Sequence, residues 1–122
     1  MSIRPHKNLV VWQEGISLVK DIYLLCSTLP ENEKFGLISQ LKRASVSIPT
    51  NIAEGAARSS DKEFAYFLHI AKGSLSEIDT LLTIATELNF VQAENLKHVL
   101  EKADRVAALL NGLIKSLKTH PQ

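Results

Sequence analysis

Histidine, cysteine, serine and carboxylate side chains are the groups in this sequence able to catalyse a reaction or bind a metal ion. The histidines are His6, His69, His98 and His120. No two of them have the four-residue spacing that places two metal ligands on one face of a helix. Glu94 and His98 are isolated and four apart, whereas bundle metal sites use Glu-x-x-His. Because a glycine-rich phosphate loop and a nucleophile elbow are also missing, the sequence predicts no enzyme, no cofactor and no metal site.

The single cysteine, Cys26, has no partner for an internal disulfide and follows Leu24 and Leu25. This setting predicts a small buried apolar side chain rather than a reactive thiol, and it fits a reducing compartment. The sequence opens without the apolar core of a signal peptide and has no apolar stretch long enough to span a membrane. We therefore expect a cytoplasmic protein.

A row of polar residues is the strongest pattern in the chain. On a helix, steps of three and four residues place its members in one line: Gln40, Arg43, Ser47, Asn51, Glu54 and Arg58. Pro49 lies within the same stretch, where it removes a backbone donor and predicts a kinked helix. Glu54 and Arg58 have the spacing of a favourable ion pair within one helix.

Two interpretations of this polar row remain open. Polar helix faces are most often solvated, and the row then faces water. Alternatively the row lies in a contact between subunits, which the many small residues from Ala44 to Ala57 favour because they permit close helix approach. Gly73 and Ser74 favour close approach later in the chain.

Four stretches of apolar residues at three- and four-residue spacing predict four helices. We expect them at about 9–29, 32–57, 60–89 and 96–117. Asn32 is a candidate N-cap of the second helix, and Ser60 with Glu63 forms a capping box for the third. Asn89, a residue that tolerates the left-handed C-cap conformation, marks the end of the third helix. The short connections predict an all-α fold, an antiparallel up-down-up-down four-helix bundle, as a single domain over residues 1–122.

The charges nearly balance, with a net charge of +1 over 122 residues. Their distribution is uneven, since residues 64–95 carry four acids and one base while residues 96–122 carry five bases and two acids. A dedicated nucleic-acid-binding domain usually has a larger basic excess. A basic surface near the chain ends remains one interpretation, and an ordinary solvated face is the other.

Three segments resemble a known family and span most of the chain: LVVWQ at 9–13, QLKRASVSIPTNIAEG at 40–55 with Arg58, and FLHIAKGSLSE at 67–77. They are similar to the bacterial four helix bundle protein family, also called the 23S ribosomal RNA intervening sequence protein family. The resemblance implies antiparallel four-helix bundles that assemble into homopentamers. A related branch, the accessory variability determinant proteins of diversity-generating retroelements, binds nucleic acid and a reverse transcriptase.

From these observations we expect a non-enzymatic, oligomeric bundle that binds RNA or DNA or assists their processing. The expected nucleic-acid contacts are Arg4, Lys7, Lys42, Arg43 and Arg58, or the bases of the last helix. The expected oligomer interface is the polar row, Gln40, Arg43, Ser47, Asn51, Glu54 and Arg58, in a homo-oligomer for which the resemblance favours a pentamer. A protein–protein interaction scaffold without nucleic acid is the main alternative. An enzyme with a polar pocket around Glu54, Arg58 and Glu77 is a third hypothesis.

Overall fold

The chain forms a bundle of four long helices in the computed structural model, which describes residues 5–118. The long helices are α1 (Val10–Cys26), α2 (Leu37–Ala56), α3 (Asp61–Glu87) and α4 (Lys97–Lys118). Short 3-10 helices are η1 (Pro5–Asn8), η2 (Glu31–Glu33) and η3 (Ala93–Leu96). Within the described residues there is no strand, so the all-α, four-helix prediction is confirmed.

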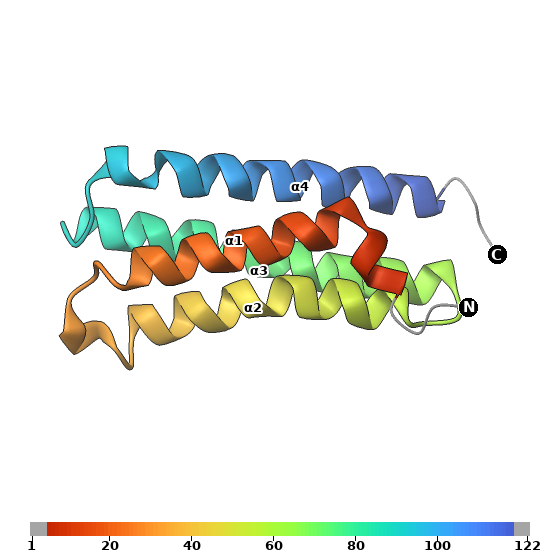
Figure 1. Cartoon of the computed structure of the whole chain (residues 1–122), viewed down its shortest axis with the longest axis horizontal. Helices are drawn as coiled ribbons and strands as arrows, with labels where there is room; N and C mark the ends of the chain where they lie inside the picture. The colour runs from red at the N-terminus through yellow and green to blue at the C-terminus, as the bar shows by residue number, and fades with distance from the viewer. Residues whose placement is uncertain (1–4, 119–122) are drawn as a thin grey trace.

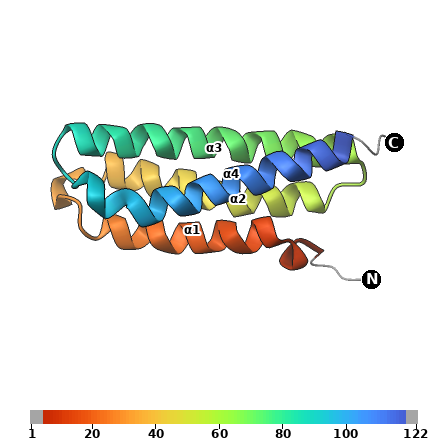
Figure 2. The same cartoon turned by 90° about the horizontal axis from the view of Figure 1, so that it is seen from above.

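Successive helices run in opposite directions. The α1–α2 and α3–α4 connections lie at one end of the bundle, and the α2–α3 connection lies at the other (Figure 1). Each helix packs on its neighbours in sequence, and α4 also packs on α1, which closes the bundle (Figure 2). Between residues 5 and 118, no helix is long and apolar enough to cross a lipid bilayer.

Apolar side chains at helical spacing meet in one core. Side chains from α1, α2 and α3 are completely buried there, among them Leu18, Ile22, Leu41, Ile48, Ile52 and Leu68. Burial of each large aliphatic side chain contributes about 1.5–3 kcal/mol relative to exposure. Cys26 belongs to this core, as predicted, and its burial raises the pKa of the thiol.

The ends of α3 follow the predicted capping chemistry. The Ser60 hydroxyl accepts a hydrogen bond from the backbone N–H of Glu63 at 3.1 Å, which satisfies one free donor of the first turn. Asn89 has a φ of 62°, the left-handed conformation that closes a helix. The backbone N–H of Phe90 donates to the carbonyl of Ala85, and that of Asn89 to the carbonyl of Thr86, which completes a Schellman motif.

The predicted start of α2 at Asn32 is wrong, because η2 occupies that part of the chain. The helix begins after Gly36, and the Glu33 carboxylate accepts a hydrogen bond from the backbone N–H of Leu37 at 3.3 Å. The end predicted for α1 near Leu29 is three residues too late, since α1 ends at Cys26.

Helix α2 continues through Pro49, which is buried. The Thr50 hydroxyl donates to the carbonyl of Val46 at 2.7 Å, four residues earlier in the same helix. Pro49 lies against α1 at Gly15, where an added Cβ would stand 3.6 Å from the proline Cβ. The kink in α2 stays a prediction.

Candidate interaction surfaces

The polar row of α2 lies along the contact with α3, and several of its members bond within the chain. Arg43 approaches Glu77 of α3 at 3.4 Å. The hydroxyls of Ser47 and Ser74 form a hydrogen bond of 2.9 Å between the two helices. Asn51 donates to both the carbonyl and the hydroxyl of Ser47, at 2.8 and 3.0 Å. The middle of the row therefore joins α2 to α3.

The ends of the row are open to solvent. Gln40 is exposed. Glu54 and Arg58 form the predicted ion pair at 3.5 Å, and the Arg58 guanidinium carbon also lies 4.8 Å from the centre of the Phe67 ring. Because both charged side chains are about half exposed, this ion pair contributes little to stability.

Helix α3 carries exposed apolar groups beside this row. Tyr66 is 63% exposed and Ile70 is 37% exposed, and Ile84 and Leu88 continue the same line toward the helix end. Gly73 lies between them, and a Cβ added there would have nothing within 4 Å. We call this surface the α2–α3 face. It consists of Gln40, Arg43, Ser47, Asn51, Glu54 and Arg58 of the α2 region, and of Tyr66, Ile70, Gly73, Glu77, Ile84 and Leu88 of the α3 region.

Small residues hold α2 and α3 close together. A Cβ added to Gly55 would stand 2.8 Å from Cδ1 of Phe64 and 2.9 Å from Cβ of Phe67. Ser45 and Ala44 are buried, and so is Ser74. The close approach expected from these small residues therefore occurs within the bundle.

The basic residues expected to contact nucleic acid do not form one patch. Lys42 points toward α1, where its ammonium lies 4.8 Å from the centre of the Tyr23 ring, whereas Arg43 is paired with Glu77. Arg58 follows the other end of α2, about 22 Å farther along the axis than Arg43. Lys7 is exposed in η1, and Arg4 lies outside the described residues.

Ion pairs between α1 and α4 form a second polar contact, which the sequence interpretation missed. Glu14 accepts hydrogen bonds from Lys102 at 2.8 Å and from Arg105 at 2.7 Å. Those two hydrogen bonds lower the pKa of the Glu14 carboxyl. Asp21 lies 3.2 Å from the ring of His98.

The signal for these α1–α4 pairs was present in the sequence. Glu14 and Asp21 are seven residues apart, and three bases of α4 recur at steps of four and three: His98, Lys102 and Arg105. Each set lies on one face of its helix. Only the packing of α4 on α1 brings the two sets together.

The pocket of the enzyme hypothesis does not form in the described chain. Glu54 pairs with Arg58 and Glu77 with Arg43, all of them partly or largely exposed. Both acids are therefore paired at the protein surface rather than enclosed in a pocket. Residues 5–118 hold no group of three histidine, cysteine or acidic side chains suited to a metal ion.

Residues 7–112 match the family described as 23S rRNA-intervening sequence protein. No curated protein matches the chain.

Proposed function

We propose that this chain, which belongs to the 23S rRNA-intervening sequence protein family, is a non-enzymatic helical bundle that assembles with copies of itself and binds RNA or DNA. Copies of the chain join through the α2–α3 face, and the assembly presents basic side chains to the nucleic acid. A pentamer is the assembly we favour. The cytoplasm is the place of action in this proposal, and the single buried thiol of Cys26 fits it.

The exposed apolar groups of the α2–α3 face are the observation that carries the assembly. Tyr66 and Ile70 are exposed, and the half-exposed charged side chains of Glu54 and Arg58 on the same face are open to a symmetric contact. An exposed glycine inside a helix costs about 1 kcal/mol relative to alanine. Gly73 has this cost in the single chain, and in the proposed assembly a neighbouring subunit lies close to its backbone.

Nucleic-acid binding is supported by symmetry rather than by one concentrated patch. Lys7 is exposed and Lys42 lies over the Tyr23 ring, and both lie outside the α2–α3 face, so a single chain offers isolated cations of modest local potential. Repetition around an oligomer multiplies these cations over one surface and strengthens the field. Contacts of this kind with phosphates weaken steeply as salt rises.

The test is binding to a structured RNA and to single-stranded DNA across a salt series, on protein whose mass in solution is known. We expect an affinity that falls steeply with salt, and a loss when Lys7 and Lys42, two bases outside the α2–α3 face, are replaced by alanine. The matched control replaces Lys20 and Lys62, two exposed bases outside the expected contacts. No binding at low salt, or equal loss in both double variants, contradicts the nucleic-acid part of the proposal.

An interaction scaffold without nucleic acid is the second candidate, and the ion pairs favour it. Arg43 and Arg58 have nearby acids, and the whole chain has a net charge of only +1. In that case the oligomer forms normally, neither nucleic acid binds at low salt, and a protein partner co-purifies with the tagged chain.

A further inference from the structure

A shallow groove runs between α3 and α4 on the side of the bundle away from the ion pairs described above. It consists of two adjoining hollows of about 330 and 190 Å³, which share Asp79 and Leu100. Its walls include the apolar side chains of Leu75 and Leu82 and the small side chains of Ala103 and Ala107. Leu75 and Leu82 are buried at its base, whereas Leu100, Ala103 and Ala107 of α4 stay partly exposed, because α3 packs less extensively on α4 than on α2.

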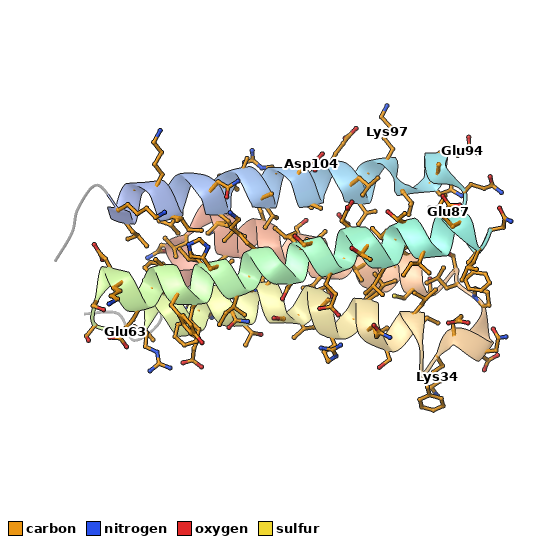
Figure 3. The ribbon with its side chains drawn as sticks, turned by 180° about the vertical axis from the view of Figure 1, so that it is seen from behind. Lys34, Glu63, Glu87, Glu94, Lys97 and Asp104 are labelled. Carbon is orange, nitrogen blue, oxygen red and sulfur yellow. The ribbon has the colours of Figure 1, made fainter. Side chains whose placement is uncertain are left out.

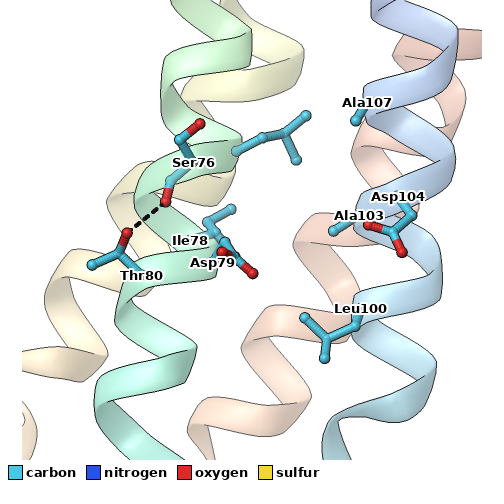
Figure 4. A pocket seen from close by; sticks show the side chains of 9 residues that line it. Ser76, Ile78, Asp79, Thr80, Leu100, Ala103, Asp104 and Ala107 are labelled. Carbon is cyan, nitrogen blue, oxygen red and sulfur yellow. Dashed lines mark hydrogen bonds between the residues drawn. The ribbon is translucent and has the colours of Figure 1, made fainter.

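The charged side chains that line the groove are all acidic. Asp79 and Asp104 stand on its opposite walls (Figure 4), and Glu87 lines its second hollow. No lysine, arginine or histidine lines either hollow. Lys97 of α4 projects away from α3 (Figure 3).

This charge arrangement differs from the other helix contacts of the bundle. Glu14 has two basic partners between α1 and α4, and Glu77 has one between α2 and α3. For Asp79, Glu87 and Asp104 no ion pair is found among residues 5–118. Two carboxylates facing each other across an apolar surface repel, and a cation between them removes that cost.

The hydroxyl groups of α3 near the groove add acceptors. Thr80, Thr83 and Thr86 each donate to the carbonyl four residues earlier, at 3.0, 2.9 and 3.0 Å. Their hydrogens are used within α3, so their oxygens are left as acceptors. The groove thus combines an apolar floor with carboxylate and hydroxyl acceptors, and a donor-rich basic group is its chemical complement.

We propose that the α3–α4 groove docks a helix of a partner protein, with lysine or arginine side chains flanking a stripe of small apolar residues. The apolar stripe covers the alanine and leucine floor, and the basic side chains pair with Asp79, Asp104 and Glu87. The groove extends along η3 and α4 from Ala93 to Ala107, about 20 Å, which matches about 13 residues of a docked helix. A helix laid in a groove between two helices is a common mode of recognition. This inference is independent of the assembly and the nucleic-acid binding proposed above.

The test uses a fluorescent synthetic helix with an alanine and leucine stripe flanked by lysines, and a second peptide in which glutamate replaces every lysine. Binding to the full chain, without nucleic acid, is followed by fluorescence anisotropy and by amide chemical shifts. We expect saturable binding of the lysine peptide alone, with shifts confined to α3 and α4. The double variant Asp79→Asn with Asp104→Asn weakens binding by about tenfold or more.

The control double variant is Glu94→Gln with Glu101→Gln, which removes the same charge from exposed acids that line neither hollow. Equal weakening in both double variants attributes binding to general charge and overturns the proposal. Shifts centred on another surface overturn it as well. If Asp79→Asn with Asp104→Asn instead lowers the mass of the oligomer, the groove is occupied by another copy of this chain and the partner helix is excluded. A failure of the assembly proposal shows in the mass alone and leaves peptide binding unchanged.

Discussion

Replacement of Gly73 by alanine has opposite expected effects on a free chain and on an assembled one. Gly73 is exposed in the middle of α3, and an added Cβ meets nothing within 4 Å. In a free chain the substitution stabilises the helix by about 1 kcal/mol, because glycine loses more backbone freedom than alanine. For a domain of this size the gain raises Tm by about 4 °C.

In an assembly joined through the α2–α3 face, the same methyl group enters a packed contact. Overpacking of such a contact costs about 1–3 kcal/mol. That cost weakens each subunit contact by about 5- to 150-fold. Since association stabilises the folded chain, the variant then loses apparent stability at concentrations where the wild type is assembled.

Gly112→Ala is the matched control, because Gly112 is also an exposed helical glycine with nothing within 4 Å of an added Cβ and lies on α4. Sedimentation velocity measures the mass of each variant across a concentration series, and thermal unfolding is followed at the same concentrations. We expect Gly73→Ala to dissociate and to melt lower, while Gly112→Ala keeps the wild-type mass and melts higher. Equal increases in Tm with unchanged masses would refute the placement of Gly73 in a subunit contact.

Three further predictions concern the fold. Gly55→Ala should lower the free energy of unfolding by about 1–3 kcal/mol in urea titration, because the added Cβ would stand 2.8 Å from Phe64. An unchanged urea midpoint of unfolding would contradict the tight α2–α3 contact. Ser60→Ala should cost about 1 kcal/mol through the lost N-cap of α3, whereas Ser59→Ala next to it should be neutral, and equal effects of both would argue against the cap. The lowered pKa of Glu14 predicts stabilisation that is present above its ordinary value of 4.5 and is lost as pH falls through its folded value. Between about pH 5 and pH 3, wild type should therefore lose more stability than Glu14→Gln, and parallel pH curves would disprove the contribution of this carboxylate.

The helices were predictable because the core demands apolar residues at helical spacing, and Ser60 and Asn89 mark their ends with local chemistry. The start of α2 was not predictable, because residues Glu31–Glu33 form a 3-10 turn instead of the first turn of the helix, and Glu33 caps the helix from outside it. A single capping candidate such as Asn32 does not decide between a 3-10 turn and an α-helix.

The surfaces were less predictable than the helices, because they depend on which helices adjoin. The polar row is one line on α2, but the rotation of that helix places Ser47 against Ser74 and leaves Gln40 open. The link from Glu14 to Lys102 spans 88 residues, so it follows only from the packing of α1 on α4. The same limit applies to the groove between Asp79 and Asp104, whose residues are unremarkable until α3 and α4 lie side by side.

The mass of the wild-type chain in solution tests the central claim most directly. Light scattering coupled to gel filtration at micromolar concentration should give a multiple of 13.5 kDa, with five copies favoured. The Ile70→Ser variant should have a lower mass. Leu24 is an exposed apolar residue of α1 outside the α2–α3 face, so the Leu24→Ser variant should keep the wild-type mass. A mass of 13.5 kDa for the wild type would contradict assembly through the α2–α3 face.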